Sequence, residues 1–122
     1  MKRILIVDDS LVIREQVSKV LTEAGYQVVE AADGLMALEE LRAAHFDLML
    51  CDVNMPRLDG LGLLERVKAD AINEGLRILM LTAEGHPAEV ARARAAGAKG
   101  WLVKPVRPDL LMMAVHKLAP PQ

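Results

Sequence analysis

Short apolar runs alternate with longer amphipathic stretches along the whole chain. Three runs, at residues 4–7, 48–51 and 78–81, are uninterrupted and bounded by polar residues. Such runs are typical of parallel strands that are buried on both faces of a sheet. Weaker runs at residues 26–30 and 100–103 fit strands at the edges of the sheet. The pattern therefore predicts five strands, of which three are central.

Between these runs, apolar residues recur at the three- and four-residue spacing of amphipathic helices. Gly25 and Gly97 are suited to end a helix, and Pro87 is suited to begin one. The helices are expected at about 13–24, 34–44, 61–67, 87–97 and 108–118. Parallel neighbours need a crossover connection, so this order predicts an α/β fold with a doubly wound five-stranded parallel sheet. With no visible linker or repeat, residues 1–122 are expected to form one domain.

Composition argues against several functional classes. A formal net charge of -2 disfavours general nucleic-acid binding, which usually requires a basic excess. The single cysteine, Cys51, cannot form an internal disulfide, which fits a reducing compartment. The apolar run after Met1 is too short for a signal peptide, and no segment is long enough to span a membrane. We therefore expect a cytoplasmic protein without nucleic-acid or membrane partners.

Polar residues follow four of the five apolar runs. In an open parallel sheet, ligands bind beyond the carboxyl ends of the strands. These positions hold three carboxylates, a hydroxyl and an ammonium group: Asp8, Asp9, Asp52, Thr82 and Lys104. Any one of them alone is more often a helix cap or a solvated loop charge. Five such groups at one end of one sheet predict a common site.

The chemistry of these groups indicates a bound divalent cation. Three crowded carboxylates raise one another's pKa unless a cation lies among them. Mg²⁺ (or Mn²⁺) accepts carboxylate oxygens and keeps several waters. The expected ligands are Asp9 and Asp52 directly, Asp8 partly through water, and the backbone carbonyl of Asn54.

The remaining groups indicate phosphoryl transfer. The Lys104 ammonium and the Thr82 hydroxyl are both suited to bind phosphoryl oxygens. Asp52 follows a central strand and is the expected nucleophile. The predicted step is in-line transfer of a phosphoryl group to its carboxylate.

Over about residues 3–118, the chain resembles the response-regulator receiver domains of two-component signalling. The motifs are Val7-Asp8-Asp9-Ser10, Asp52-Val53-Asn54-Met55-Pro56 with Asp59-Gly60, Thr82-Ala83, and Lys104-Pro105. The resemblance implies a flavodoxin-like (βα)5 fold of the CheY kind, with strand order 2-1-3-4-5. It implies that Asp8 and Asp9 bind the metal and that Asp52 is the phosphoacceptor. Lys104 would pair with the phosphoryl group, and the bond from Lys104 to Pro105 is usually cis in this family.

Within this family, the chain looks most like the single-domain chemotaxis regulators. Asp9-Ser10 with Arg14, the run from Asp52 to Gly60, and Gly100-Trp101-Leu102-Val103-Lys104-Pro105 carry this likeness. It implies that Asn54 and Glu84 tune hydrolysis of the acyl phosphate, and that Thr82, Trp101 and Pro105 belong to a switch. Trp101 departs from the family, which usually has Tyr or Phe at this position. In the family this side chain turns inward or outward with the switch, and the larger indole fits the inward-facing pocket less well.

The resemblance also implies partners. The phosphoryl donor would be a sensor histidine kinase or a histidine phosphotransfer protein. A monomer would then bind an effector, such as a flagellar motor or other motility component. Helix 87–97 holds Val90 as its only large apolar residue and lies on the expected output face. The candidate contacts on this face are Arg92, Arg94, Lys99, Trp101, Met112 and Met113.

Three other interpretations remain open. The chain could be a phosphorelay intermediate, a phosphate sink, or a receiver domain excised from a larger regulator. An aspartate-nucleophile phosphatase is disfavoured, because such enzymes need a second acid two residues after the nucleophile, where this chain has Asn54. We therefore expect a signalling protein that assists its own phosphorylation and dephosphorylation, and not an enzyme acting on external substrates.

Overall fold

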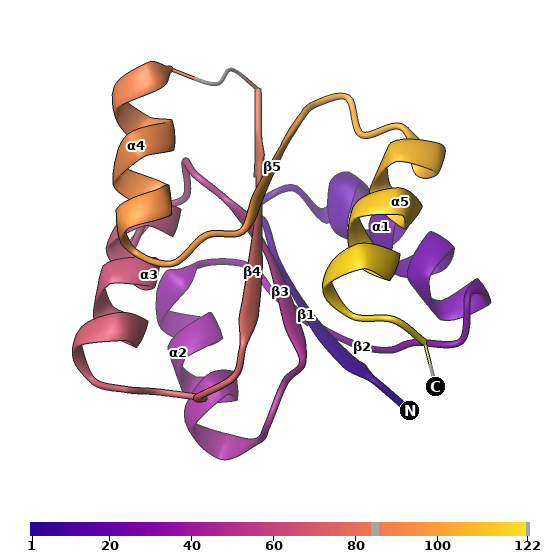
Figure 1. Ribbon diagram of the computed structural model, residues 1–122, viewed down its shortest axis with the longest axis horizontal. Helices are drawn as coiled ribbons and strands as arrows, with labels where there is room; N and C mark the ends of the chain where they lie inside the picture. Colours follow the sequence, from indigo (N-terminus) through magenta and orange to yellow (C-terminus); the bar gives the residue numbers. More distant parts are fainter. Residues whose placement is uncertain (84–85, 122) are drawn as a thin grey trace.

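The computed structural model describes residues 1–83 and 86–121, which form one parallel sheet with helices on both faces (Figure 1). The strands are β1 (Arg3–Val7), β2 (Gln27–Ala31), β3 (Leu48–Asp52), β4 (Arg77–Thr82) and β5 (Gly100–Val103). The helices are α1 (Leu11–Glu23), α2 (Gly34–Ala43), α3 (Gly60–Ala69), α4 (Pro87–Ala95) and α5 (Pro108–Leu118). The strand order is β2-β1-β3-β4-β5 with parallel pairing throughout. The predicted fold and strand order are confirmed.

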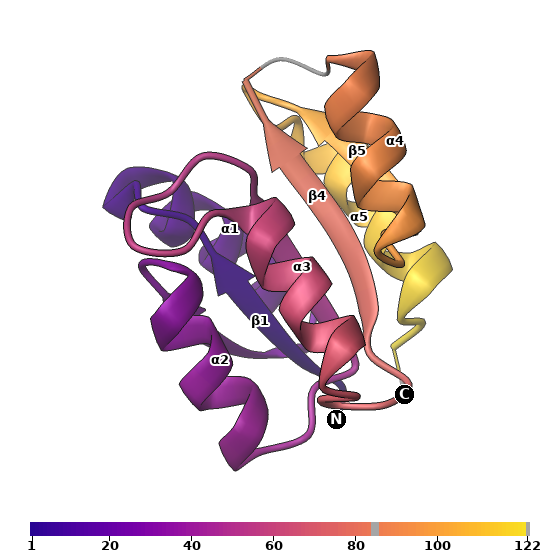
Figure 2. The same cartoon turned by 90° about the vertical axis from the view of Figure 1, so that its left-hand side faces the viewer.

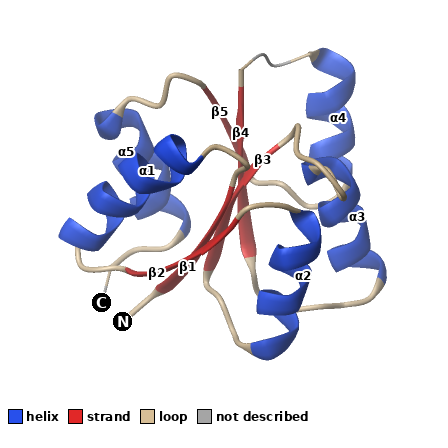
Figure 3. Cartoon of the chain, turned by 180° about the vertical axis from the view of Figure 1, so that it is seen from behind, coloured by secondary structure: helices blue, strands red, loops and turns tan. Residues whose placement is uncertain are grey.

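Two apolar cores lie on opposite faces of the sheet. Helices α1 and α5 cover one face, and α2, α3 and α4 cover the other (Figures 1 and 3). Along β1, Leu5 and Val7 join the core under α2–α4, whereas Ile4 and Ile6 join the core under α1 and α5. This alternation follows from the two-residue period of a strand. Because both faces are covered, the central strands must be apolar at every position.

Two strands are one residue longer at their carboxyl ends than the sequence predicts. Asp52 is the last residue of β3, and Thr82 is the last residue of β4. In the register of the sheet, Asp52 is the partner of Leu81, and Thr82 is the partner of Val103. Polar residues continue the strands because neighbouring backbones still pair there. The two side chains are therefore held by the sheet and not by a loop.

Other boundaries differ from the predictions by one or two residues. β2 begins at Gln27 and not at Tyr26, and it includes Ala31. α2 ends at Ala43, one residue before the expected end, and α4 ends at Ala95. No helix among the described residues has the length and apolar character needed to cross a membrane.

Helices α1, α2 and α3 begin at the carboxyl edge of the sheet with side-chain caps. Ser10 Oγ accepts a hydrogen bond from the Ile13 amide at 3.3 Å. Asp33 and Asp59 cap α2 and α3 in the same way, at 2.9 Å and 2.7 Å. Such caps satisfy amides that have no partner within the helix. They also fix the loops that join β1, β2 and β3 to these helices. These loops lie at one edge of the sheet (Figure 2).

The start of α3 lies against the end of β3. The Gly60 amide donates to the Val53 carbonyl at 2.8 Å. A Cβ atom on Gly60 would overlap the Asp52 carbonyl oxygen and lie 3.0 Å from Val53 Cα. Only glycine fits this close approach of two backbones.

Gly60→Ala is therefore expected to lower the free energy of unfolding by roughly 1–3 kcal/mol, the usual effect of overpacking. Without the clash, alanine would stabilise a helical position by up to about 1 kcal/mol. Urea denaturation of both proteins measures the difference. A variant as stable as the parent would contradict the tight fit.

Candidate functional site at the carboxyl edge of the sheet

Three carboxylates meet at the carboxyl ends of β1 and β3. One oxygen each from Asp8, Asp9 and Asp52 lies within 4.8 Å of the others. Asp8 is completely buried, Asp52 is 5% exposed, and Asp9 is exposed to solvent. The sheet brings these residues together because β1 and β3 are hydrogen-bonded neighbours. The predicted carboxylate cluster is thus present.

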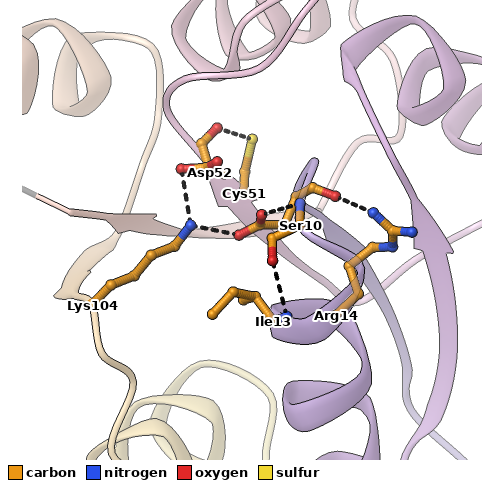
Figure 4. Close-up of polar contacts among 7 residues, drawn as sticks. Ser10, Ile13, Arg14, Cys51, Asp52 and Lys104 are labelled. Atoms are coloured by element: carbon orange, nitrogen blue, oxygen red, sulfur yellow. Dashed lines mark hydrogen bonds and ion pairs between the residues drawn. The ribbon is translucent and has the colours of Figure 1, made fainter.

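Lys104 reaches into this cluster from the end of β5. Its Nζ atom lies 2.7 Å from Asp8 Oδ2 and 3.4 Å from Asp52 Oδ1 (Figure 4). The Lys104 amide donates to the Thr82 carbonyl at 2.6 Å, which extends the pairing of β4 with β5. The bond from Lys104 to Pro105 is cis, as the family resemblance implies.

Burial and charge perturb both partners of the Lys104–Asp52 pair. Burial, together with the negative charge of Asp8, raises the pKa of Asp52 to about 6, although Lys104 opposes this shift. Burial lowers the pKa of Lys104, but hydrogen bonding and charge from Asp8 and Asp52 outweigh it, so the net shift is upward. The ammonium therefore stays charged at neutral pH and partly compensates the clustered carboxylates.

The acidic loop after β1 is held by contacts that sequence reasoning missed. The Asp8 amide donates to the Ala31 carbonyl at 3.1 Å, and the Ser10 amide donates to Asp8 Oδ1 at 2.8 Å. Arg14 Nη1 donates to the Asp8 carbonyl at 2.6 Å, and Arg14 Nε pairs with Glu30 at 3.2 Å. The available signal was the position of Arg14, one helical turn after the cap residue Ser10.

The loop after Asp52 is tied to the start of α2, a second link that sequence reasoning missed. Arg57 has a positive φ of 67°, and its Nε pairs with Asp33 Oδ2 at 2.8 Å. This hydrogen bond is the largest influence on the pKa of Asp33, which is lowered. The Gly34 amide also donates to the Leu58 carbonyl at 3.1 Å. These contacts fix the loop that carries Asn54.

A polar cavity of about 290 Å³ lies at the carboxyl ends of β3 and β4. It is lined by Asn54, Thr82, Ala83, His86 and Glu89. Thr82 is 1% exposed, and Asn54 is exposed at the cavity. The structure thus brings Thr82 and Asn54 to one space, as expected for two groups of a common site. Glu84 lies outside the described residues.

The residues expected on the output face have different environments. Arg94, Lys99 and Met113 are exposed. Arg92 is also exposed but makes a bidentate ion pair with Glu65 of α3, with N–O distances of 2.8 and 2.6 Å. α4 buries only Ala93 along its length, as its alanine-rich sequence suggests. Its attachment to α3 is therefore partly polar.

Two apolar residues of the output face, Trp101 and Met112, are partly buried. Trp101 packs against the core under α2–α4, and its Nε1 atom is buried without a hydrogen-bond partner among the described residues. Met112 packs against the core under α1 and α5. Met113 therefore offers a partner more apolar surface than Met112 does.

The donor set fits a hard divalent cation. All three side chains offer carboxylate oxygens, which Mg²⁺ and Mn²⁺ prefer. Asp8 Oδ2 is buried and lies 2.7 Å from the Lys104 ammonium. Burial is the main cause of the raised pKa of Asp52, and a cation among these oxygens would relieve the repulsion from Asp8 that adds to it.

Comparison with known proteins agrees with this geometry. Residues 4–116 match the response regulator receiver domain family, so the chain belongs to that family. It is a receiver domain of the two-component type. Members of this family are signalling proteins that interact with histidine kinases and effectors.

Individual relatives are similar over nearly their full length. The chemotaxis protein CheY of Pseudomonas aeruginosa is 37% identical over 117 residues, which cover 95% of this chain and 94% of that protein. The structure of CheY4 of Vibrio cholerae is 42% identical with a TM-score of 0.91, covering 97% and 98% of the two chains. The response regulator TrrA of Thermotoga maritima, solved with Mg²⁺ and BeF, is 34% identical with a TM-score of 0.86, covering 97% and 99%.

The raised pKa of Asp52 predicts a stability effect in the absence of divalent cations. The pKa is about 6 in the fold and near 4 in an unfolded chain. Folding is therefore penalised as Asp52 ionises, progressively between about pH 4 and pH 6 and fully at pH 7. Asp52→Asn should be more stable than the parent at pH 7, and this advantage should vanish near pH 4. Urea denaturation with a chelator measures both. A variant that is less stable at pH 7 would contradict the assignment.

Proposed function

We propose that residues 1–122 form a single receiver domain that accepts a phosphoryl group on Asp52 in a reaction dependent on Mg²⁺ or Mn²⁺. The donor would be a sensor histidine kinase or a histidine phosphotransfer protein. The observation that carries this proposal is the convergence of Asp8, Asp9 and Asp52 within 4.8 Å, with the Lys104 ammonium beside them. We also propose, from the sequence, that the protein is monomeric and cytoplasmic.

Asp52 is the proposed nucleophile. With a pKa of about 6, its carboxylate is mostly ionised at neutral pH. One carboxylate oxygen forms a bond to phosphorus while the bond from phosphorus to the donor's imidazole nitrogen breaks. The leaving nitrogen takes a proton from solvent. Because Asp52 ends β3 in register with β4, its carboxylate is already positioned for this attack.

The remaining residues bind and orient the transferred group. The Asp8, Asp9 and Asp52 carboxylates, with the Asn54 backbone carbonyl, would hold the cation. When bound, the cation supplies positive charge next to the phosphoryl oxygens. The Lys104 ammonium exchanges its contact with Asp8 for a phosphoryl oxygen, and the Thr82 hydroxyl donates to another.

We further propose that phosphorylation changes affinity for an effector. Thr82, Trp101 and Pro105 would form the switch, because Thr82 pairs with β5 at Val103 and Trp101 lies on that same strand. Asn54, at the cavity beside Thr82, would tune hydrolysis of the acyl phosphate, as would Glu84. The output face would include Arg92, Arg94, Lys99, Trp101, Met112 and Met113. The similarity to CheY proteins supports a chemotaxis or motility effector, such as a flagellar motor component.

The test is incubation with acetyl phosphate, with and without Mg²⁺, followed by intact-mass spectrometry. We expect a single phosphoryl adduct that requires the cation, because Asp52 faces two other carboxylates whose charge repels an anionic donor. Mn²⁺ should replace Mg²⁺.

Asp52→Asn is the matched control, since it keeps the size of the side chain and removes the nucleophile. It should give no adduct. An equal adduct in this variant would refute the assignment of Asp52. An adduct formed on the parent protein without any divalent cation would refute the cation requirement.

A further inference from the structure

We propose that Arg14 is a positioning residue for the cation site, acting by fixing the peptide unit between Asp8 and Asp9. This inference rests on the proposed function, because it takes the three carboxylates as a divalent-cation site. It adds a residue of α1 that does not itself offer a ligand atom. The predicted consequence is a change in cation affinity when the contact of Arg14 is lost.

Arg14 links the end of β1 to the edge strand β2. Its side chain is only 14% exposed. Nη1 donates to the Asp8 carbonyl at 2.6 Å, while Nε donates to Glu30 Oε1 at 3.2 Å (Figure 4 shows Arg14 beside the loop at Ser10). A guanidinium suits this role because its planar fork can hold two acceptors at once.

The Asp8 carbonyl belongs to the peptide that joins the two acidic residues. A peptide unit is planar, so the direction of this carbonyl also sets the direction in which Asp9 leaves the strand. The Asp8 carboxylate has contacts of its own, from the Ser10 amide at 2.8 Å and from Lys104 at 2.7 Å. The structure gives the exposed Asp9 carboxylate no hydrogen bond to another described residue. The position of Asp9 therefore depends on the peptide that Arg14 holds.

The charge of Arg14 and its positioning of the Asp8–Asp9 peptide have opposite effects on the affinity for the cation. A positive charge near the site repels a cation, so its removal alone would tighten binding. Glu30 pairs with this charge and reduces its effect at a distance. Loss of a group that orients a metal ligand usually weakens metal affinity by about 10- to 100-fold. We therefore expect the loss of positioning to dominate.

The experiment is isothermal titration of Mg²⁺ into the full chain. Arg14→Met should raise the Kd for Mg²⁺ by about tenfold, at the lower end of the range for such groups. Arg14→Lys should restore part of the affinity, because an ammonium group can still donate to the Asp8 carbonyl. Arg66→Met is the matched control and should leave the Kd unchanged, since Arg66 pairs with Asp70 on the exposed surface of α3.

Glu30→Gln distinguishes the effect of charge on the Kd from the effect of positioning. This variant can be measured even if Arg14→Met does not fold. It leaves the contact of Arg14 with Asp8 in place while removing the neutralising carboxylate. If positioning dominates, its effect on the Kd should be clearly smaller than that of Arg14→Met or, failing that variant, of Arg14→Lys. A larger effect in Glu30→Gln would overturn the inference.

Two further results are informative. An unchanged or lower Kd in folded Arg14→Met would overturn the positioning role while leaving the proposed function intact. No Mg²⁺ binding by the parent protein would instead overturn the cation site, and this inference with it.

Discussion

The structure of the site depends on two aspartates buried side by side at one edge of a parallel sheet. Asp8 directly follows β1 and Asp52 ends β3, and these two strands are hydrogen-bonded neighbours, so both buried side chains lie at the same edge of the sheet. Their mutual repulsion is met by one ammonium group, that of Lys104, from the far strand β5. The fold thus maintains a cluster of like charges that favours a bound cation, and the chemistry of the site follows from that constraint.

The loops around these aspartates are fixed by contacts between elements. Caps at Ser10, Asp33 and Asp59 start the three helices that surround the site, and the close approach at Gly60 holds α3 against β3. Catalytic groups work best when they are held in place before the substrate arrives. Helix α4, on the same face of the sheet as α3, buries little apolar surface and is attached to α3 partly through the Arg92–Glu65 pair. A rigid site next to a lightly packed helix is a suitable arrangement for a switch.

Local patterns in the sequence predicted the α/β class, the carboxylate cluster and Lys104, whereas the strand order came from the family resemblance. Central strands must be apolar on both faces, and polar residues at their ends therefore stand out. The ion pairs of Arg14 with Glu30 and of Arg57 with Asp33 were missed, since they join residues far apart in sequence on different elements. The Arg92–Glu65 pair was missed for the same reason. Asp52 and Thr82 were placed after their strands because backbone pairing leaves no mark in the hydrophobic pattern.

The most direct test of the account is a crystal structure of the protein with Mg²⁺ and beryllofluoride, a stable mimic of a phosphoryl group. The account predicts beryllofluoride on the Asp52 carboxylate and the cation among Asp8, Asp9 and Asp52. It also predicts that Lys104 Nζ leaves its 2.7 Å contact with Asp8 for a fluorine atom. Beryllofluoride bound away from Asp52, or an unchanged Lys104–Asp8 pair with no cation at the carboxylates, would contradict it.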